Sequence, residues 1–300
     1  MPFGSFSLGI SRLAREYDAP MDFLEALHSR PVVIGDGAMG ALLFERGVAP
    51  DVCLEELSAS QPELIKAIHH EYILAGAQFI RTHSFGANAA RLARFGSERR
   101  VGELNWLAAR TAREAAKGTN VWVAASVGPS GCPADGSVDL VALFQDQLGA
   151  LLDGGVDFVI LETFTSVVEL KAAIEAKHSL HHCPVVASLA GIDPVSAVEA
   201  FPELRAAGAD VVGLNCTGDF EAIHSALAQT ALNEPISLFP SAGIPGKTGA
   251  SLRYPVDAAT FASQGEALAG LGVRLIGGCC GTTPKYIAAL AERLKMPVLS

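Results

Sequence analysis

Cysteine is scarce in this 300-residue chain, with 6 residues, and positive charge is scarce too, with 22 lysines and arginines against 32 acidic residues. So few cysteines exclude a small scaffold held together by disulfides. A formal net charge of −10 without a basic stripe argues against a nucleic-acid partner and against attraction to anionic membranes. No apolar stretch of about 18 residues and no leader pattern is visible, so the sequence predicts no membrane segment and a cytoplasmic protein.

The chain is rich in hydrophobic residues. Half of its residues are hydrophobic and only 18% are charged, which predicts a large buried core rather than disorder. Short apolar, β-branched runs recur at 31–37, 77–85, 120–129, 156–163, 184–191, 209–218, 235–243 and 273–281. Helical patterns rich in alanine, leucine and glutamate lie between them, for example at 62–76, 103–117, 166–180 and 283–295. Nearly continuous hydrophobicity is typical of strands that are buried on both faces of a parallel sheet.

Eight such strand–helix units fit an α/β fold with a single (β/α)8 barrel, also called a TIM barrel. An open doubly wound sheet is the alternative. Because no linker or composition shift divides the chain, we expect an N-terminal extension over 1–20 and one barrel domain over 21–300. The long connection after the first strand predicts an extra loop around 48–57. The chain could be a complete small protein or one domain of a longer one.

Two glycine motifs resemble phosphate-binding loops. The segment 35–40 matches G-x-G-x-x-G, but the next strand is expected only at residue 77, and Asp36 would repel a pyrophosphate inside the turn. The turn suits a smaller anion better, such as an amino-acid carboxylate held by backbone N–H groups at a helix start. The segment 246–248 resembles the end of a P-loop, but Ser241 stands where that motif requires its first glycine.

The cysteines carry the strongest chemical signal. Cys216 ends the sixth expected strand, and Cys279 and Cys280 end the eighth. Active sites of such barrels lie at the carboxyl ends of the strands, and alternate strands share a layer, so we expect the three sulfurs to converge. Three thiolates suit Zn²⁺ and leave a fourth position open, as in catalytic sites. Since zinc deprotonates a bound thiol, the predicted substrate is a thiol that attacks an electrophilic methyl group.

Five motifs then resemble one family. They are GDGAMG (35–40), VILETF (159–164), GLNCTG (213–218), FPSAGIPG (239–246) and GGCCGTTP (277–284). In this order, over about residues 30–295, the chain resembles the homocysteine S-methyltransferase family. The resemblance implies a (β/α)8 barrel that transfers a methyl group to the zinc-bound thiol of homocysteine and so forms methionine.

Carried over by position, the family's site residues fall at the ends of several strands. The zinc ligands would be Cys216, Cys279 and Cys280. The substrate-binding residues would be Asp36, Gly37, Ala38, Met39, Glu162 and Asn215. Among these, Glu162 would bind the substrate ammonium, and the backbone of residues 37–39 would receive its carboxylate. From the residues alone, Glu162 could instead cap a helix or lie in a surface loop, and Asn215 could satisfy backbone groups at a turn.

The chain departs from the family pattern at two substrate-facing positions. His83 stands where the family commonly has asparagine in Thr-Asn-Thr-Phe, and Ser241 replaces asparagine in Pro-Asn-Ala-Gly. We include both among the candidate substrate-binding residues. Because of these two departures, a small thiol other than homocysteine is an alternative acceptor. His83 could titrate or hydrogen-bond at the barrel mouth, or it could be structural.

The methyl donor follows from smaller likenesses. The segments PSAGIPG and LEEL (54–57) resemble the homocysteine-binding module of cobalamin-dependent methionine synthases. They predict methylcobalamin, or another methyl-corrinoid on a second domain or protein, as the donor. S-adenosylmethionine, S-methylmethionine and betaine are alternatives, and betaine would need an aromatic cage, for which Phe44, Phe85 and Phe164 are candidates. A non-enzymatic zinc- or thiol-binding module is the remaining alternative.

Residues outside the motifs have plainer interpretations. Cys53, Cys132 and Cys183 are expected to act as small buried hydrophobic residues. The two tryptophans, Trp106 and Trp122, are expected in the core.

Overall fold

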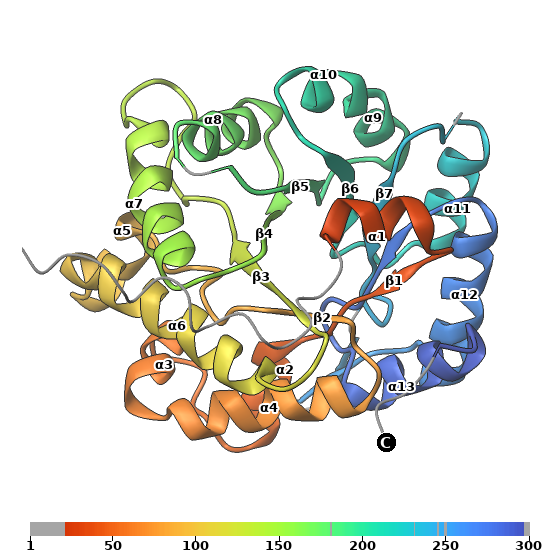
Figure 1. The fold of residues 1–300 in the computed structure, drawn as a ribbon, viewed down its shortest axis with the longest axis horizontal. Helices are drawn as coiled ribbons and strands as arrows, with labels where there is room; N and C mark the ends of the chain where they lie inside the picture. The colour runs from red at the N-terminus through yellow and green to blue at the C-terminus, as the bar shows by residue number, and fades with distance from the viewer. Residues whose placement is uncertain (1–21, 181, 231, 245, 249–250, 297–300) are drawn as a thin grey trace, which may run out of the picture.

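The computed structural model describes residues 22–180, 182–230, 232–244, 246–248 and 251–296, and their arrangement is a closed barrel (Figure 1). Eight parallel strands form one sheet in the order β1-β10-β7-β6-β5-β4-β3-β2. A parallel bridge between Gly35 and Phe79 joins its two outer strands. The predicted single (β/α)8 barrel is therefore confirmed, and the open doubly wound sheet is not formed. The expected extension over 1–20 lies outside the described residues.

The barrel strands lie where the apolar runs predicted them. Their bounds are β1 Val33–Ile34, β2 Phe79–Arg81, β3 Trp122–Val127, β4 Phe158–Phe164, β5 Val185–Leu189, β6 Val211–Asn215, β7 Ile236–Phe239 and β10 Leu275–Ile276. Only β4 passes its expected end, by one residue. Nearly every strand residue is buried, because the barrel interior covers one face and the helices cover the other.

Helices surround the strands in the ring expected of this fold (Figure 1). Their bounds are α1 Phe23–Ser29, α2 Met39–Glu45, α3 Leu57–Ser60, α4 Pro62–Leu74, α5 Ala89–Leu92, α6 Val101–Ala116, α7 Leu140–Asp153, α8 Val167–His178, α9 Pro194–Glu199, α10 Phe201–Ala206, α11 Phe220–Ala228, α12 Ala258–Gly270 and α13 Pro284–Arg293. Short 3₁₀ turns cover Leu54–Glu56, Ala93–Phe95 and Glu98–Arg100. The loop expected around 48–57 is thus a short irregular segment between α2 and α3. Helices α4 and α13 begin at prolines, which fit a first helical turn.

The apolar core has two layers. One lies between strands and helices, and the other fills the barrel, where α1 closes the amino end by stacking Phe23 on Phe158 with 3.7 Å between ring centroids. Trp122 is buried in this inner layer, as expected. The expectation for Trp106 is wrong. Its side chain is 45% exposed on α6, where Arg110 lies over the ring, because this face of the helix points away from the strands.

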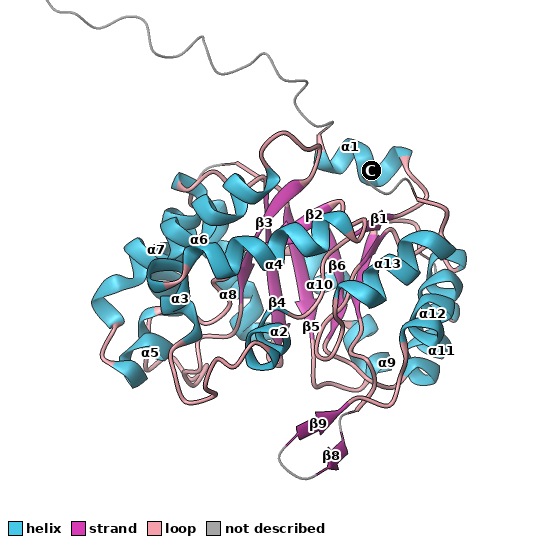
Figure 2. Ribbon diagram, turned by 90° about the horizontal axis from the view of Figure 1, so that it is seen from below, coloured by secondary structure: helices cyan, strands magenta, loops and turns pink. Residues whose placement is uncertain are grey.

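The two ends of the barrel differ. Helix α1 lies at one end, and an antiparallel hairpin of β8 (Gly246–Thr248) and β9 (Ser251–Arg253) projects beyond the other (Figure 2). The sequence did not predict this hairpin, which follows β7. No helix in the described part of the chain is both long and apolar enough to cross a membrane.

Candidate active site

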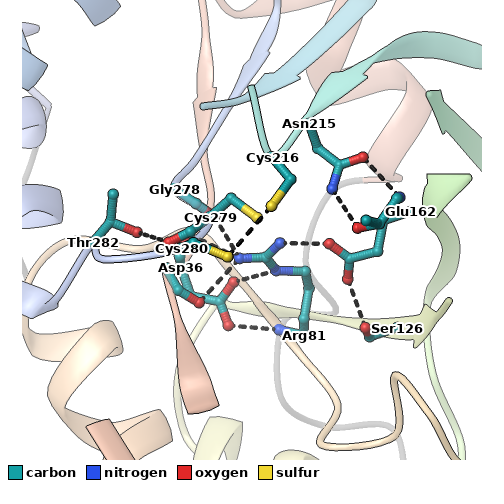
Figure 3. Close-up of polar contacts among 12 residues, drawn as sticks. Asp36, Arg81, Ser126, Glu162, Asn215, Cys216, Gly278, Cys279, Cys280 and Thr282 are labelled. Atoms are coloured by element: carbon teal, nitrogen blue, oxygen red, sulfur yellow. Dashed lines mark hydrogen bonds and ion pairs between the residues drawn. The ribbon is translucent and has the colours of Figure 1, made fainter. Parts of the chain in front are cut away.

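Three cysteine side chains meet at the carboxyl end of the barrel (Figure 3). Cys216 directly follows β6, and Cys279 and Cys280 follow β10. Their sulfur atoms all lie within 4.8 Å of one another, and the Sγ atoms of Cys216 and Cys280 are 3.3 Å apart. Since β6 and β10 flank β7, the structure brings together the three sulfurs that the strand positions predicted.

The backbone around these thiols is held in unusual conformations. Cys216 has a positive φ of 53°, which costs free energy in a residue other than glycine. Its N–H donates to the carbonyl of Phe239 at 2.9 Å, which fixes that turn. A Cβ at Gly278 would lie 2.1 Å from the Thr282 hydroxyl, and that hydroxyl donates to the Cys279 carbonyl at 2.6 Å. The glycines beside the cysteine pair are therefore needed for a tight turn.

The three thiols fit a zinc ion. Tetrahedral zinc with Zn–S bonds of about 2.3 Å separates its sulfur ligands by about 3.8 Å, which lies within the spread seen here. Hydrogen bonds with Cys279 and Cys280 lower the pKa of Cys216, and hydrogen bonds with Cys216 and Cys280 raise the pKa of Cys279. Of the other cysteines, Cys53 is buried, whereas Cys132 and Cys183 are only half-buried, so the expectation of burial holds fully for Cys53 alone.

A cavity of about 1000 Å³ opens beside the thiols. Of the residues predicted to bind substrate or metal, its lining includes Asp36, Gly37, Ala38, Met39, His83, Glu162, Cys216, Cys279 and Cys280. Asn215 and Ser241 are not among the lining residues. Positions from five strand ends, far apart in sequence, thus share one space.

The side chain of Asn215 forms hydrogen bonds with Thr163, the residue that follows Glu162. Its Oδ1 accepts from the Thr163 N–H at 2.8 Å, and its Nδ2 donates to the Thr163 hydroxyl at 2.7 Å. Thr163 has a φ of 67°, a conformation that is strained for a β-branched residue. Asn215 therefore has the backbone contacts that the sequence left open as an alternative, and its contact with substrate stays a prediction. Ser241 also contacts a neighbour rather than the cavity, with its hydroxyl 3.8 Å from the Cys216 sulfur.

Arg81, at the end of β2, is a site residue that sequence reasoning missed. Its Nε donates to Asp36 Oδ1 at 2.7 Å, and its Nη1 donates to Glu162 Oε2 at 2.8 Å (Figure 3). Nη2 donates to the carbonyls of Gly37 at 3.0 Å and Gly278 at 2.7 Å. Spacing could have revealed it, because Arg81 lies two residues after Phe79 and therefore points into the barrel with it.

The charges of this cluster depend on one another. Burial by itself lowers the pKa of Arg81, but the carboxylates of Glu162 and Asp36 raise it above its usual value. Burial also raises the pKa of Asp36, and the hydrogen bonds and charge of Arg81 oppose that rise. The other oxygen of Glu162 accepts from the Ser126 hydroxyl at 2.5 Å. Both oxygens of Asp36 and both oxygens of Glu162 accept hydrogen bonds, as carboxylate groups do.

His83 and the glycine turn, the last two predicted parts of the site, have hydrogen-bond partners within the protein. His83 Nε2 donates to the Leu54 carbonyl at 2.7 Å, and burial lowers the pKa of His83, with the charge of Glu55 opposing. In the glycine turn, the Ala38 N–H donates to the Thr282 carbonyl at 2.9 Å. No side chain caps the start of α2. Of the three amides predicted to receive a carboxylate, that of Ala38 is therefore already in use.

Fold and site together define a class: a (β/α)8 barrel with a three-thiol metal centre and a charged cavity at the carboxyl end of its strands. The model of the family described as homocysteine S-methyltransferase matches residues 33–294. The chain therefore belongs to the homocysteine S-methyltransferase family, and the predicted family is confirmed.

Relatives of several kinds share this family. Methionine synthase of Mycobacterium leprae is 30% identical over 93% of this chain and 25% of its own length. Betaine–homocysteine S-methyltransferase 1 of Xenopus laevis is 30% identical over 92% of this chain and 76% of its own. The metallated form of the homocysteine methyltransferase MmuM from Escherichia coli is 28% identical, with a TM-score of 0.71 over 90% of this chain and 98% of that one. The chain thus spans about a quarter of the methionine synthases it matches.

Proposed function

We propose that this chain is a zinc-dependent methyltransferase that moves a methyl group to the thiol of homocysteine and forms methionine. The proposed donor is a methyl-corrinoid, such as methylcobalamin, carried by another domain or protein. The observation that carries the proposal is the convergence of Cys216, Cys279 and Cys280 beside a charged cavity of about 1000 Å³. Membership of the family and likeness to a metallated homocysteine methyltransferase support it.

The three cysteines would hold the metal and leave one tetrahedral position for the acceptor. When bound, Zn²⁺ supplies the positive charge that keeps the acceptor thiol in its thiolate form at neutral pH. The acceptor sulfur then uses a lone pair to bond the methyl carbon. The bond between that carbon and the donor breaks, and its electron pair leaves with the donor, so that no separate oxidant or reductant is required.

The cavity offers groups for both ends of an amino acid. The acceptor's ammonium would lie beside Glu162, whose oxygens accept from Arg81 and Ser126 and still have free lone pairs. The carboxylate would be received by the amides of Gly37 and Met39 at the start of α2, with Asp36 holding the turn through Arg81. His83 lines the cavity and Ser241 contacts Cys216, so another small thiol is the second candidate for the acceptor.

Overall identity does not select the donor, because the methionine synthase and the betaine–homocysteine S-methyltransferase are both 30% identical to this chain. Of the three phenylalanines considered for an aromatic cage, Phe164 is fully buried and packs on Phe144 with 5.8 Å between ring centroids. Phe44 and Phe85 line the cavity. The loss of Phe164 from the candidate cage weighs against betaine, and the motifs that resemble methionine synthase favour the corrinoid.

The test is a donor panel on zinc-loaded protein. Homocysteine is offered with methylcobalamin, S-adenosylmethionine, S-methylmethionine, betaine or methyltetrahydrofolate, and methionine is measured. We expect one zinc per chain and turnover with methylcobalamin. The variant Cys216→Ala should lose both metal and activity, whereas Cys132→Ala, a cysteine outside the site, should keep both.

Four outcomes would contradict parts of the proposal. Absence of stoichiometric zinc in the reduced protein, or an unaffected Cys216→Ala variant, removes the metal mechanism. Turnover with a different donor only would replace the corrinoid. Zinc binding without methyl transfer from any donor is the result that the non-enzymatic module predicts.

A further inference from the structure

Three residues that line the cavity, Asp36, Arg81 and Glu162, are charged and buried. Asp36 and Glu162 are 3% and 5% exposed, and Arg81 between them is 9% exposed. Two carboxylates and one guanidinium leave this cluster with one uncompensated negative charge. An unpaired buried charge is costly, so the cluster is complete only when one further positive charge arrives.

Arg81 is fixed in place by the way its donors are used. Its backbone N–H and Nε go to the two oxygens of Asp36, at 2.8 and 2.7 Å, and Nη1 goes to Glu162 at 2.8 Å. Nη2 donates to the carbonyls of Gly37 and Gly278, which belong to the glycine turn and to the loop that carries Cys279. A guanidinium does not lose its proton in proteins, so this positive charge is permanent.

Resting on the proposed function, we propose that Arg81 is a positioning residue that sets the charge of the acceptor. It neutralises one of the two buried carboxylates and leaves the other for a single ammonium group. The acceptor is therefore a thiol that carries an ammonium, and a mercapto acid without one brings a second negative charge into a cluster that is already negative. Without Arg81, the cluster would hold two unbalanced negative charges and would favour a purely cationic thiol still more strongly.

The test compares two probes that each keep one end of homocysteine. Aminopropanethiol keeps the ammonium, and mercaptobutanoate keeps the carboxylate. Their binding to the zinc-loaded protein is measured by calorimetry beside homocysteine itself. In Arg81→Gln, the affinity ratio of aminopropanethiol to mercaptobutanoate should rise about ten-fold or more, because two charges of one sign now act at close range. In Arg81→Lys, which keeps the charge but not the planar fork, homocysteine should bind more weakly with the ratio almost unchanged.

Asp36→Asn provides a second measurement, which changes the charge in the opposite direction without touching Glu162. It should lower the affinity ratio of aminopropanethiol to mercaptobutanoate by a similar factor. This measurement does not depend on whether Arg81→Gln folds. Arg46→Gln, which breaks an exposed ion pair with Glu71, is the matched control and should leave the ratio unchanged. Equal weakening of both probes in Arg81→Gln and Asp36→Asn would overturn the charge role and leave a structural one. Failure of the wild-type protein to bind homocysteine, or to methylate it, would instead count against the proposed function.

Discussion

Single residues at the site hold conformations that most residues avoid. Cys216 directly follows β6 and Thr163 is the last residue but one of β4, and their φ values are 53° and 67°. Such backbone costs about 1–3 kcal/mol per residue and persists only where its surroundings enforce it. Here the enforcing contacts are visible: Asn215 binds Thr163 twice, and Phe239 holds the Cys216 amide. The strain thus lies next to Glu162, the proposed partner of the acceptor's ammonium, and at Cys216, a proposed metal ligand.

Replacing Asn215 by alanine should therefore disturb Glu162 more than the metal. We expect Asn215→Ala to lower the free energy of unfolding by about 1–3 kcal/mol, since two part-buried hydrogen bonds are lost. The KM for the acceptor should rise while zinc stoichiometry stays the same, as measured by denaturant titration, kinetics and metal analysis. Thr163→Gly relieves the strained backbone, so Asn215→Ala should cost less in that background. Equal costs in both backgrounds would show that the two residues are not coupled.

The glycine beside the cysteine pair gives a second prediction. In Gly278→Ala the new Cβ would press on Thr282 at 2.1 Å and displace the hydroxyl that holds the Cys279 carbonyl. Zinc affinity should fall by about 10-fold or more, by analogy with the loss of groups that orient metal ligands. Gly149→Ala on α7, where a Cβ meets nothing within 4 Å, is the control, and it should stabilise the protein by up to about 1 kcal/mol. Competition with a metal-sensitive chelator dye measures the zinc affinity of both variants. Equal zinc affinities in Gly278→Ala and Gly149→Ala would refute the role of Thr282.

The ligands were easier to predict from sequence than their supports. Cys216, Cys279 and Cys280 belong to recognisable motifs at strand ends, so their convergence followed from the fold. Arg81 belongs to no motif, and although strand spacing places it inside the barrel, its partners Asp36 and Glu162 are known only once the barrel has formed. A buried arginine requires carboxylate partners, but the sequence alone does not say which ones.

Among the elements, those with strong patterns were predictable and the short ones were not. All eight barrel strands coincide with apolar runs, and α4, α6, α8 and α13 overlap the expected helices. Helix α1 has seven residues and forms because its apolar face closes the barrel, a tertiary reason that no local pattern contains. The β8–β9 hairpin has three residues in each strand, too few to show an alternation.

Helix α1 lies at the end of the barrel opposite the site (Figure 2), so the two ends can be separated experimentally. Phe23→Ala removes the ring that stacks on Phe158 and should cost about 3–5 kcal/mol of stability, as for other buried phenylalanines. The zinc content of the folded fraction and its KM for the acceptor should not change, because the active sites of such barrels lie at the carboxyl ends of the strands. A shift in zinc affinity at a temperature where the variant is folded would show that the ends are coupled.

Helix α4 contains a group that should make stability depend on pH. His69 is fully buried, and neither ring nitrogen has a hydrogen-bond partner among the described residues. Burial, with smaller contributions from His83 and His70, lowers the pKa of His69 to about 3. An unfolded histidine has a pKa near about 6.5, so the folded state binds fewer protons between these values.

The stability associated with His69 is therefore complete above about pH 6.5 and is lost as the pH falls. At pH 5 the free energy of unfolding should be about 2 kcal/mol lower than at pH 7.5 from this residue alone. His69→Leu should remove that part of the slope, which urea titrations at both pH values can measure. His70→Leu serves as the control, and an identical slope in His69→Leu and the parent would contradict the prediction.

At the scale of the whole molecule, the closure of the barrel depends on few backbone contacts. β1 and β10 contain two residues each, and β1 meets β2 through one bridge. Side chains add to this closure, since the carboxylate of Asp36 after β1 binds both the backbone and the guanidinium of Arg81 on β2. A metal held by Cys216 and the cysteine pair would connect β6 to β10 across β7.

Zinc should therefore stabilise the entire fold. A ligand at 1,000 times its dissociation constant adds about 4 kcal/mol to the free energy of unfolding when only the folded state binds it. We expect the melting temperature to rise on zinc loading and to fall with a chelator, in differential scanning calorimetry. Cys216→Ala should melt at the same temperature with and without zinc, and a zinc-dependent rise in that variant would place the metal elsewhere.

The order of the three cysteines along the chain also has a consequence for biosynthesis. Two of them lie in the last strand–helix unit, 63 residues or more after Cys216. A nascent chain cannot assemble the centre until nearly all of the barrel has left the ribosome, and a product truncated before residue 279 keeps only one of the three sulfurs. Capture of the metal would thus report that synthesis has run to the end of the barrel.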